Sequence, residues 1–296
     1  MSHKAGYVSI IGKPNVGKST LMNALVGERL SIITPKAQTT RHRILGMVNT
    51  EEYQIIFSDT PGIIKPQYEL QDAMMTAVKG ALSDADLILF VTDINEKHDE
   101  NDVLEKIAKT EIPIIVLINK IDNANQELVD EKTKYWQERL NPKQIFAISA
   151  LHQYNLDGLL DTVLSYIPEH PAYFDKEELT DRSMRFFVSE IIREKIFQNY
   201  QKEIPYSTEV IITAYKEAES KSGPMIRITA EIIVERDSQK NILIGTGGAM
   251  LKKVGMEARK DIEKFTGEKI FLETFVKVIP DWRSKKNYLK NFGYEN

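Results

Sequence analysis

Residues 7–26 read Tyr-Val-Ser-Ile-Ile-Gly-Lys-Pro-Asn-Val-Gly-Lys-Ser-Thr-Leu-Met-Asn-Ala-Leu-Val, and this stretch decides the fold. Its centre, from Gly12 to Ser19, fills the pattern G-x-x-x-x-G-K-[ST] of a phosphate-binding loop (P-loop), between an apolar run typical of a strand and a helical pattern. Glycines let the backbone approach phosphates closely, Lys18 reaches the β- and γ-phosphates, and the Ser19 hydroxyl is a ligand for Mg²⁺. The stretch therefore predicts a strand, a loop and a helix that bind a nucleoside triphosphate.

Three later motifs each follow another apolar run and indicate which nucleotide is bound. Asp59-Thr60-Pro61-Gly62 is a D-x-x-G, whose Asp can support the Mg²⁺ shell and whose Gly N–H can face a γ-phosphate. Asn119-Lys120-Ile121-Asp122 is an N-K-x-D, in which a carboxylate can accept two hydrogen bonds from guanine that adenine does not offer. Ser149-Ala150-Leu151 could place a backbone N–H behind the base. Together the motifs favour GTP over ATP.

Composition limits the class of protein further. The 296-residue chain has a formal net charge of −4 and no cysteine, which excludes disulfides and cysteine-based metal sites and fits a reducing cytoplasm. The longest apolar runs are about seven residues, far short of the roughly 20 needed to cross a bilayer, and the start has no apolar run of signal-peptide length. We expect a soluble, cytoplasmic protein. Histidines are scattered without ligand spacing, so we expect no catalytic role, only exposed or locally hydrogen-bonded positions, for His3, His42, His98, His152 and His170.

The order of apolar runs predicts two domains. Up to residue 167, strands alternate with helical patterns, which is typical of an α/β doubly wound sheet. Nucleotide loops gather at the carboxyl ends of strands in such sheets, where all four motifs fall. Two prolines and turn residues in 168–180 predict a linker, and 181–296 form the second domain. The strands of the first domain are expected at 7–12, 43–49, 53–58, 86–92, 112–118 and 144–148.

The second domain has a different order of elements and a basic bias. From Lys240 onward the chain has 12 basic against 7 acidic residues, which suggests a polyanionic partner. The expected elements are a helix at 181–200, strands at 208–217 and 225–236, a helix from about 238, a second helix to about 265, and a strand at 268–278 before a basic tail. This α-β-β-α-α-β order, with a G-x-x-G between the two middle helices, resembles a type II KH module, which clamps single-stranded RNA. RNA contacts are expected at Gly245, Thr246, Gly247, Gly248, Lys252 and Lys253.

A GTPase domain followed by a type II KH domain resembles the Era family over nearly the whole chain. The stretches Thr39-Thr40-Arg41 and Glu257-Ala258-Arg259 add to the motifs already quoted. The resemblance implies a GTPase that binds the 3′ region of small-subunit (16S) ribosomal RNA, assists maturation of the 30S subunit, does not act on DNA, and associates peripherally with the cytoplasmic membrane. One departure is Thr246-Gly247, where the family often has a lysine. The nucleotide contacts implied are Gly12, Lys13, Pro14, Asn15, Val16, Gly17, Lys18, Ser19, Thr20, Asp59, Thr60, Pro61, Gly62, Asn119, Lys120, Asp122, Ser149 and Ala150.

Residues near the phosphates raise the question of how water is activated. Ile63 follows the D-x-x-G where Ras-like enzymes have a glutamine, and isoleucine cannot orient water. Lys18, Thr40 and Asn15 are the candidate catalytic residues, with Asn15 resembling an asparagine that helps bind K⁺ in related GTPases. Ser19, Thr40 and Asp59 are the candidate Mg²⁺ ligands, although the sequence leaves Thr39 and Thr40 open. An alternative cation is Arg41, which we expect to be exposed and solvated.

Two other kinds of protein remain open at this point. An RNA-binding adaptor could bind GTP without hydrolysing it, and Ile63 is the best support for that reading. A membrane-surface protein could act through the basic, aromatic stretch Asp281–Lys290, which could equally be a solvated terminal helix.

Overall fold

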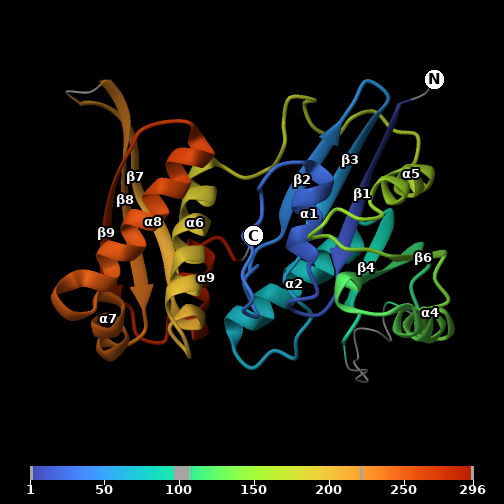
Figure 1. Cartoon of the computed structure of the whole chain (residues 1–296). Helices are drawn as coiled ribbons and strands as arrows, with labels where there is room; N and C mark the ends of the chain where they lie inside the picture. Colours follow the sequence, from blue (N-terminus) through green and yellow to red (C-terminus); the bar gives the residue numbers. More distant parts are fainter. Residues whose placement is uncertain (1–2, 97–106, 108, 221–222, 295–296) are drawn as a thin grey trace. The chain divides into compact units, whose positions relative to one another are not determined.

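The computed structural model describes residues 3–96, 107, 109–220 and 223–294, and the chain divides into two compact units. The first unit comprises residues up to 67 and 71–181, and the second comprises 182 onward with 68–70 (Figure 1). Each unit has its own sheet, and the two sheets differ in topology. The predicted helix between the fourth and fifth strands, and His98, fall mostly or wholly outside the described residues.

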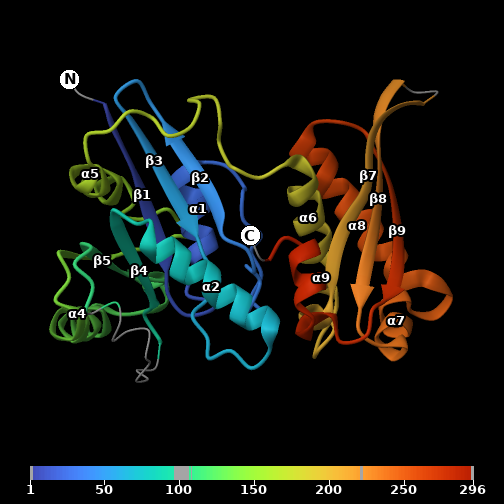
Figure 2. The ribbon, with the colours of Figure 1, turned by 180° about the vertical axis from the view of Figure 1, so that it is seen from behind.

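The first unit contains a six-stranded mixed sheet in the order β2-β3-β1-β4-β5-β6, in which β2 alone pairs antiparallel. All six residues of β5 are buried, as expected for a strand covered on both faces. Helices α1 and α2 lie on opposite faces of the sheet (Figures 1 and 2), so the predicted doubly wound architecture is confirmed. The strands are β1 (Lys4–Ile11), β2 (Ile44–Asn49), β3 (Tyr53–Asp59), β4 (Leu87–Asp93), β5 (Ile114–Asn119) and β6 (Gln144–Ala147), and the helices are α1 (Lys18–Val26), α2 (Glu69–Ser83), α4 (Gln126–Leu140), α5 (Asp157–Tyr166) and a 3₁₀ turn at Ile121–Asn123.

The stretch predicted as a linker lies against the first unit. The carbonyl of Leu179 accepts a hydrogen bond from the N–H of Met47 on the edge strand β2 at 2.9 Å. The Gln54 side chain, fully buried, accepts hydrogen bonds from the N–H groups of Tyr173 and Phe174 at 2.7 and 3.0 Å. We call residues 169–181 the strap, because they are fixed along β2 and β3 instead of being extended into solvent.

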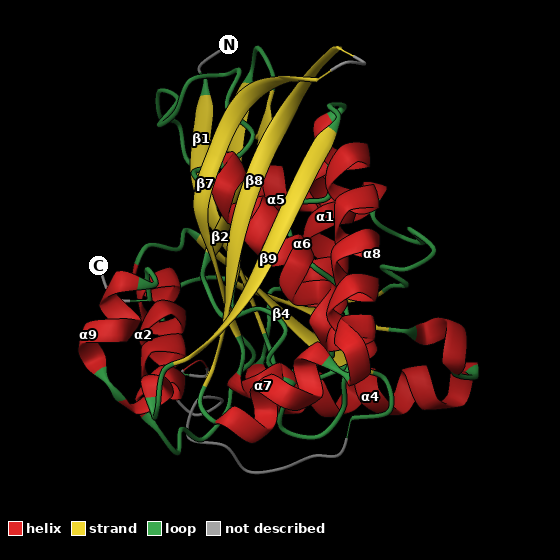
Figure 3. Ribbon diagram, turned by 90° about the vertical axis from the view of Figure 1, so that its left-hand side faces the viewer, coloured by secondary structure: helices red, strands yellow, loops and turns green. Residues whose placement is uncertain are grey.

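The second unit packs helices on one face of a three-stranded sheet. Strand β8 pairs antiparallel with β7 and parallel with β9. Apolar side chains from α6, α8 and the inner face of the sheet form a core of the unit's own, and Figure 3 shows the strands in front of these helices. The elements are α6 (Met184–Asn199), β7 (Glu209–Ser220), β8 (Gly223–Val234), α7 (Asp237–Ile244), α8 (Ala249–Thr266), β9 (Ile270–Val278), and 3₁₀ turns at Pro205–Ser207 and Thr246–Gly248. This is the predicted α-β-β-α-α-β order.

The basic tail is a folded part of the second unit. A 3₁₀ turn (Trp282–Ser284) leads into the short helix α9 (Lys286–Asn291). Trp282 is 0% exposed and donates its indole N–H to the carbonyl of Ser207 at 3.1 Å, and Leu289 is also 0% exposed. Of the two readings that the sequence leaves open for this stretch, a membrane-surface segment and a solvated terminal helix, neither accounts for Trp282 and Leu289, which are both buried. Within the described residues, no helix combines the length and the apolar character needed to cross a bilayer.

Candidate nucleotide-binding site and glycine loop

The P-loop folds tightly between β1 and α1. Gly12 has φ +154°, and a Cβ atom there would lie 2.1 Å from the carbonyl oxygen of Val91. Gly17 has φ +98°, and its Cβ would lie 2.2 Å from the Asn119 amide nitrogen. Because no side chain fits at either position, these glycines are required for the loop to pack on the neighbouring strand ends.

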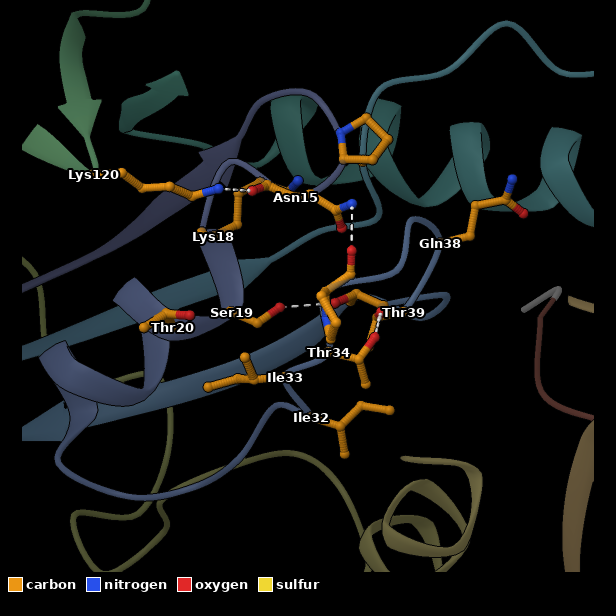
Figure 4. Close-up of a pocket in the computed structure, with 15 residues that line it drawn as sticks. Asn15, Lys18, Ser19, Thr20, Ile32, Ile33, Thr34, Gln38, Thr39 and Lys120 are labelled. Carbon is orange, nitrogen blue, oxygen red and sulfur yellow. Dashed lines mark hydrogen bonds between the residues drawn. The ribbon is translucent and has the colours of Figure 1, made fainter. Parts of the chain in front are cut away.

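A pocket of about 380 Å³ opens above the start of α1 (Figure 4). It is bounded by the P-loop, by the segment 32–40 that precedes β2, and by residues from two other strand ends. The motifs from distant parts of the sequence thus meet at the carboxyl edge of the sheet, as predicted. The lining residues are Pro14, Asn15, Gly17, Lys18, Ser19, Thr20, Ile32, Ile33, Thr34, Pro35, Gln38, Thr39, Thr40, Gly62 and Lys120.

Lys18 is one of two lysines that line this pocket, and it is the buried one. Its ammonium group donates to the carbonyls of Gly12 and Lys13 at 3.1 and 2.8 Å. Burial lowers the pKa of Lys18 to about 8, while the negative charges of Asp59 and Glu96 oppose that shift. A buried ammonium already aimed along the P-loop is suited to a polyphosphate, whose charge favours the protonated form.

Ser19, Thr40 and Asp59 form a cluster of oxygen atoms beside the pocket. The Ser19 hydroxyl donates to Asp59 Oδ2 at 2.7 Å and lies 2.8 Å from Thr40 Oγ1. Asp59 is 0% exposed, burial raises its pKa, and its Oδ1 accepts no hydrogen bond from the part of the chain that is described. Two hydroxyls and a carboxylate with one unused oxygen form a donor set that suits Mg²⁺.

Thr39 faces a different way from Thr40. Its hydroxyl lies 2.6 Å from Thr34 Oγ1 and donates to the carbonyl of Lys36 at 2.7 Å, so it closes its own loop. This geometry favours Thr40 as the Mg²⁺ ligand, a choice that the sequence leaves open.

Asp122 and Ser149 meet at the other end of the site. The Ser149 hydroxyl donates to Asp122 Oδ1 at 2.6 Å, and this hydrogen bond lowers the pKa of Asp122. The exposed carboxylate is therefore ionised at neutral pH and available to a base with adjacent N–H donors.

The Asn119 side chain makes two hydrogen bonds within the protein that its motif alone does not predict. Its Nδ2 donates to the carbonyl of Val16 in the P-loop at 2.8 Å, and its Oδ1 accepts from the N–H of Ala150 at 2.9 Å. Asn119 thus uses the N–H of Ala150, and the N–H of Ser149 donates to the carbonyl of Tyr154, so within Ser149-Ala150-Leu151 these two donors are already engaged inside the protein. Asn119 joins the phosphate and base ends of the site.

Two stretches beside the P-loop line the pocket: segment 32–40, which we call the switch segment, and the residues that follow Asp59. Ile63 is 5% exposed and its N–H donates to the carbonyl of Gly12, so its side chain cannot orient water. Thr60 donates to the carbonyl of Ile10, and Pro61 is buried beside it. Arg41 is 1% exposed, which corrects the expectation of a solvated arginine. Asn15 donates its amide to the carbonyl of Pro35 at 3.0 Å, between the P-loop and the switch segment.

Sequence reasoning missed two acidic residues at the end of β4. Asp93 Oδ2 lies 2.7 Å from Lys120 Nζ, and Glu96 Oε1 lies 3.1 Å from Lys13 Nζ. The available signal was their position directly after a buried strand, at the edge where the motifs gather. Among the described histidines none lines the pocket, and His42 is buried. The described residues contain no cluster of three or more His, Cys, Asp or Glu side chains that could hold a metal ion.

The glycine loop of the second unit joins α7 to α8. Gly245, Gly247 and Gly248 all have positive φ angles, and added Cβ atoms at Gly247 and Gly248 would meet nothing within 4 Å. Thr246 is exposed, and Lys252 and Lys253 are exposed on the first turns of α8. Ile242 and Met256, which flank the loop on α7 and α8, are 52% and 54% exposed. The loop therefore presents open backbone, with exposed lysines following it on α8 and exposed apolar side chains on both adjoining helices.

Comparison with known proteins agrees with both halves of this description. A family model described as 50S ribosome-binding GTPase matches residues 7–120, and a KH domain model matches residues 203–283. The chain is 43% identical to GTPase Era of Staphylococcus haemolyticus over 99% of its length and 97% of that protein, and 42% identical to GTPase Era of Alkaliphilus metalliredigens over the full length of both.

Two solved structures are similar along almost the whole chain. One is Era in complex with MgGDPNP and nucleotides 1506–1542 of 16S ribosomal RNA, and the other is an Aquifex aeolicus Era variant bound to GDP·AlF₄⁻. Each has a TM-score of 0.92 and 41% identity, and the match covers 99% of this chain and 100% of the solved one.

Proposed function

The chain belongs to the Era family of GTPases, and from that premise we propose that it is a GTP-hydrolysing switch that binds the 3′ region of small-subunit ribosomal RNA and assists maturation of that subunit. The observation that carries the first part is the cluster of Ser19, Thr40 and Asp59 beside Lys18. The RNA partner is inferred from the glycine loop and from the Era structure that contains 16S ribosomal RNA.

Within this proposal each group has a defined role. Lys18 and the N–H groups at the start of α1 bind the β- and γ-phosphates. Ser19, Thr40 and Asp59 would hold Mg²⁺, which supplies positive charge against the phosphate oxygens when bound. Thr40 lies in the segment that precedes β2, so loss of the γ-phosphate would release this segment, as in other GTPase switches.

Guanine selection is assigned to Asp122. Its carboxylate accepts from guanine N1–H and N2–H₂, and Ser149 orients it. In Asp122→Asn, the amide can donate as well as accept, so affinity should move from guanine to xanthine nucleotides by orders of magnitude. Measuring GTP and XTP binding tests this assignment, and a variant that kept the affinity of the wild type for GTP would refute it.

Slow hydrolysis is expected, because Ile63 is buried and orients no water. We place the intrinsic rate near that of Ras, about 10⁻⁴ to 10⁻³ s⁻¹. K⁺ bound between Asn15 and carbonyls of the switch segment would add positive charge beside the phosphates, and the Asn15 contact with Pro35 supports this position. GTP turnover should then be faster in K⁺ than in Na⁺, and Asn15→Ala should remove the difference.

The same assay separates a GTPase from an adaptor that binds GTP without hydrolysing it. No turnover in K⁺, with or without the RNA, would favour the adaptor.

The cytoplasm is the proposed location of the protein. Peripheral association with the membrane would depend on exposed lysines, because Trp282 is buried. Flotation with anionic vesicles tests that association.

A further inference from the structure

The acidic end of β4 contacts the P-loop through two lysines. Lys120, paired with Asp93, also donates to the carbonyl of Asn15 at 2.6 Å. Lys13, the residue after Gly12, pairs with Glu96 at 3.1 Å. One strand end therefore contacts the P-loop at two points, on either side of Pro14.

Glu96 is fixed at both carboxylate oxygens. Oε1 pairs with Lys13, while Oε2 accepts from the Thr92 hydroxyl at 2.9 Å. Only 12% of its side chain is exposed, against 21% for Lys13. A carboxylate held in this way presents one oxygen to the P-loop in a defined place, unlike a freely rotating surface side chain.

The sheet positions the end of β4, which Glu96 follows. Strand β4 pairs with β1 on one side and with β5 on the other, and the N–H of Glu96 donates to the carbonyl of Asp93 at 2.8 Å. The strand end is thus positioned by the sheet, whereas the P-loop passes through Asn15 at φ +64°, a conformation uncommon for a residue other than glycine. Of the two partners, the loop is the one that needs positioning.

Lys13 does not belong to the phosphate pocket in this arrangement. The residues lining the pocket, among those the structure describes, include Pro14 and Lys18 but not Lys13. Its ammonium group is directed to Glu96 instead.

We propose that Glu96 is a positioning residue for nucleotide binding, which acts through Lys13 to fix the P-loop in its phosphate-binding conformation. This inference rests on the proposed nucleotide binding at the same site. Loss of the pair should let the loop leave that conformation more often, so bound GDP should dissociate faster.

The direction of the effect distinguishes positioning from simple charge. Glu96 carries negative charge near a site for a polyanion, so neutralising it would by Coulomb's law slow GDP release. If Glu96 positions the P-loop, neutralising it should instead speed GDP release. Glu96→Gln, nearly isosteric, should release a fluorescent GDP derivative about fivefold faster than the wild type, the size expected for a partly buried ion pair.

A double-mutant cycle on the full-length protein completes the test. Lys13→Gln should also speed release, the double variant should be no faster than the faster single variant, and Lys13→Arg, which keeps the pair, should release GDP more slowly than Lys13→Gln. Glu111→Gln, a neutralised exposed glutamate of the same unit, is the control and should leave release unchanged. Melting curves show whether each variant is folded, and if Glu96→Gln is not, Lys13→Gln against Lys13→Arg tests the pair from the loop side.

The outcomes separate this inference from the function beneath it. Unchanged or slower release in Glu96→Gln, or multiplying effects in the double variant, overturns the role of Glu96 while leaving GDP binding in place. A wild-type protein that does not bind GDP overturns the proposed function itself.

Discussion

At the scale of single residues, the hydrogen bond from Ser149 to Asp122 has a measurable consequence for nucleotide binding. It lowers the pKa of Asp122, and guanine requires the ionised carboxylate. In Ser149→Ala the pKa should rise toward its ordinary value. As pH falls, the variant is protonated first, so its GDP affinity should decline at a higher pH than that of the wild type. Titrating GDP affinity from pH 7 downward checks this.

Ser165→Ala is the matched control, since that hydroxyl donates only locally on α5, to the carbonyl of Thr162. If GDP affinity declined at the same pH in the wild type and in Ser149→Ala, the link between Ser149 and guanine recognition would be contradicted.

Sequence patterns specify residues whose chemistry is local, and they fail where a partner comes from elsewhere. Lys18 and Ser19 follow from one octapeptide. By contrast, Thr39 and Thr40 are adjacent and chemically identical, and only the path of the switch segment turns Thr40 toward Ser19. The sequence predicts a backbone N–H of Ser149-Ala150-Leu151 behind the base without saying which one, and the N–H of Ala150 is bound by Asn119 from another strand end. Such choices depend on tertiary contacts that spacing does not encode.

At the scale of elements, one buried amide holds the first half of the strap. Gln54 accepts from the N–H groups of Tyr173 and Phe174 and donates to the carbonyl of Phe174 at 3.0 Å. Gln54→Ala leaves these groups unpaired, at about 1–3 kcal/mol. Hydrogen exchange at the two amides should therefore speed up by roughly 10- to 100-fold. Gln126→Ala on the exposed face of α4 should leave both rates unchanged, and equal protection in Gln54→Ala would show that the strap is fixed by other contacts.

The buried tail makes a second prediction at this scale. Trp282 is 0% exposed, and its ring packs edge-on against Phe292 with centroids 5.5 Å apart. Trp282→Ala should lower the free energy of unfolding of the second unit by about 3–5 kcal/mol. Urea unfolding followed by circular dichroism measures this loss. Phe271→Ala, which removes an aromatic ring that is 44% exposed, is the control, and an equally small effect of both changes would mean that the tail does not belong to the core.

The strands of the first unit were predictable from their apolar runs. Apolar runs located every strand of the first unit to within three residues at either end, because strands buried on both faces are almost continuously apolar. The prolines of 168–180 predict a linker, and composition does not report that this stretch pairs with β2 through the hydrogen bond from the N–H of Met47 to the carbonyl of Leu179. The lysines of the tail suggested a solvated or membrane-facing stretch, whereas Trp282 and Leu289 beside them are buried.

At the scale of the whole molecule, two separate cores imply that the two binding functions can be separated. The second unit has a hydrophobic core of its own, built from α6, α7, α8 and all three strands. The glycine loop and the basic excess both lie in that unit. RNA binding should therefore reside in residues from about 180 to 296 and persist without the GTPase half.

The glycine loop gives this assignment its sharpest test. Gly247 has φ +59° and faces open space, so Gly247→Asp adds bulk and negative charge where RNA backbone must approach, without a clash inside the unit. It should weaken binding of a single-stranded oligomer from the small-subunit 3′ end severely. Replacing both Lys252 and Lys253 by Ala should flatten the log–log salt dependence by about 1.4, since each phosphate contact contributes about 0.7 on a single strand. Filter binding at several salt concentrations, with a scrambled oligomer as control, measures both effects. If Gly247→Asp kept full affinity with an intact circular dichroism spectrum, the open loop backbone would not be the RNA contact, and the second unit would have to act on a protein or a membrane.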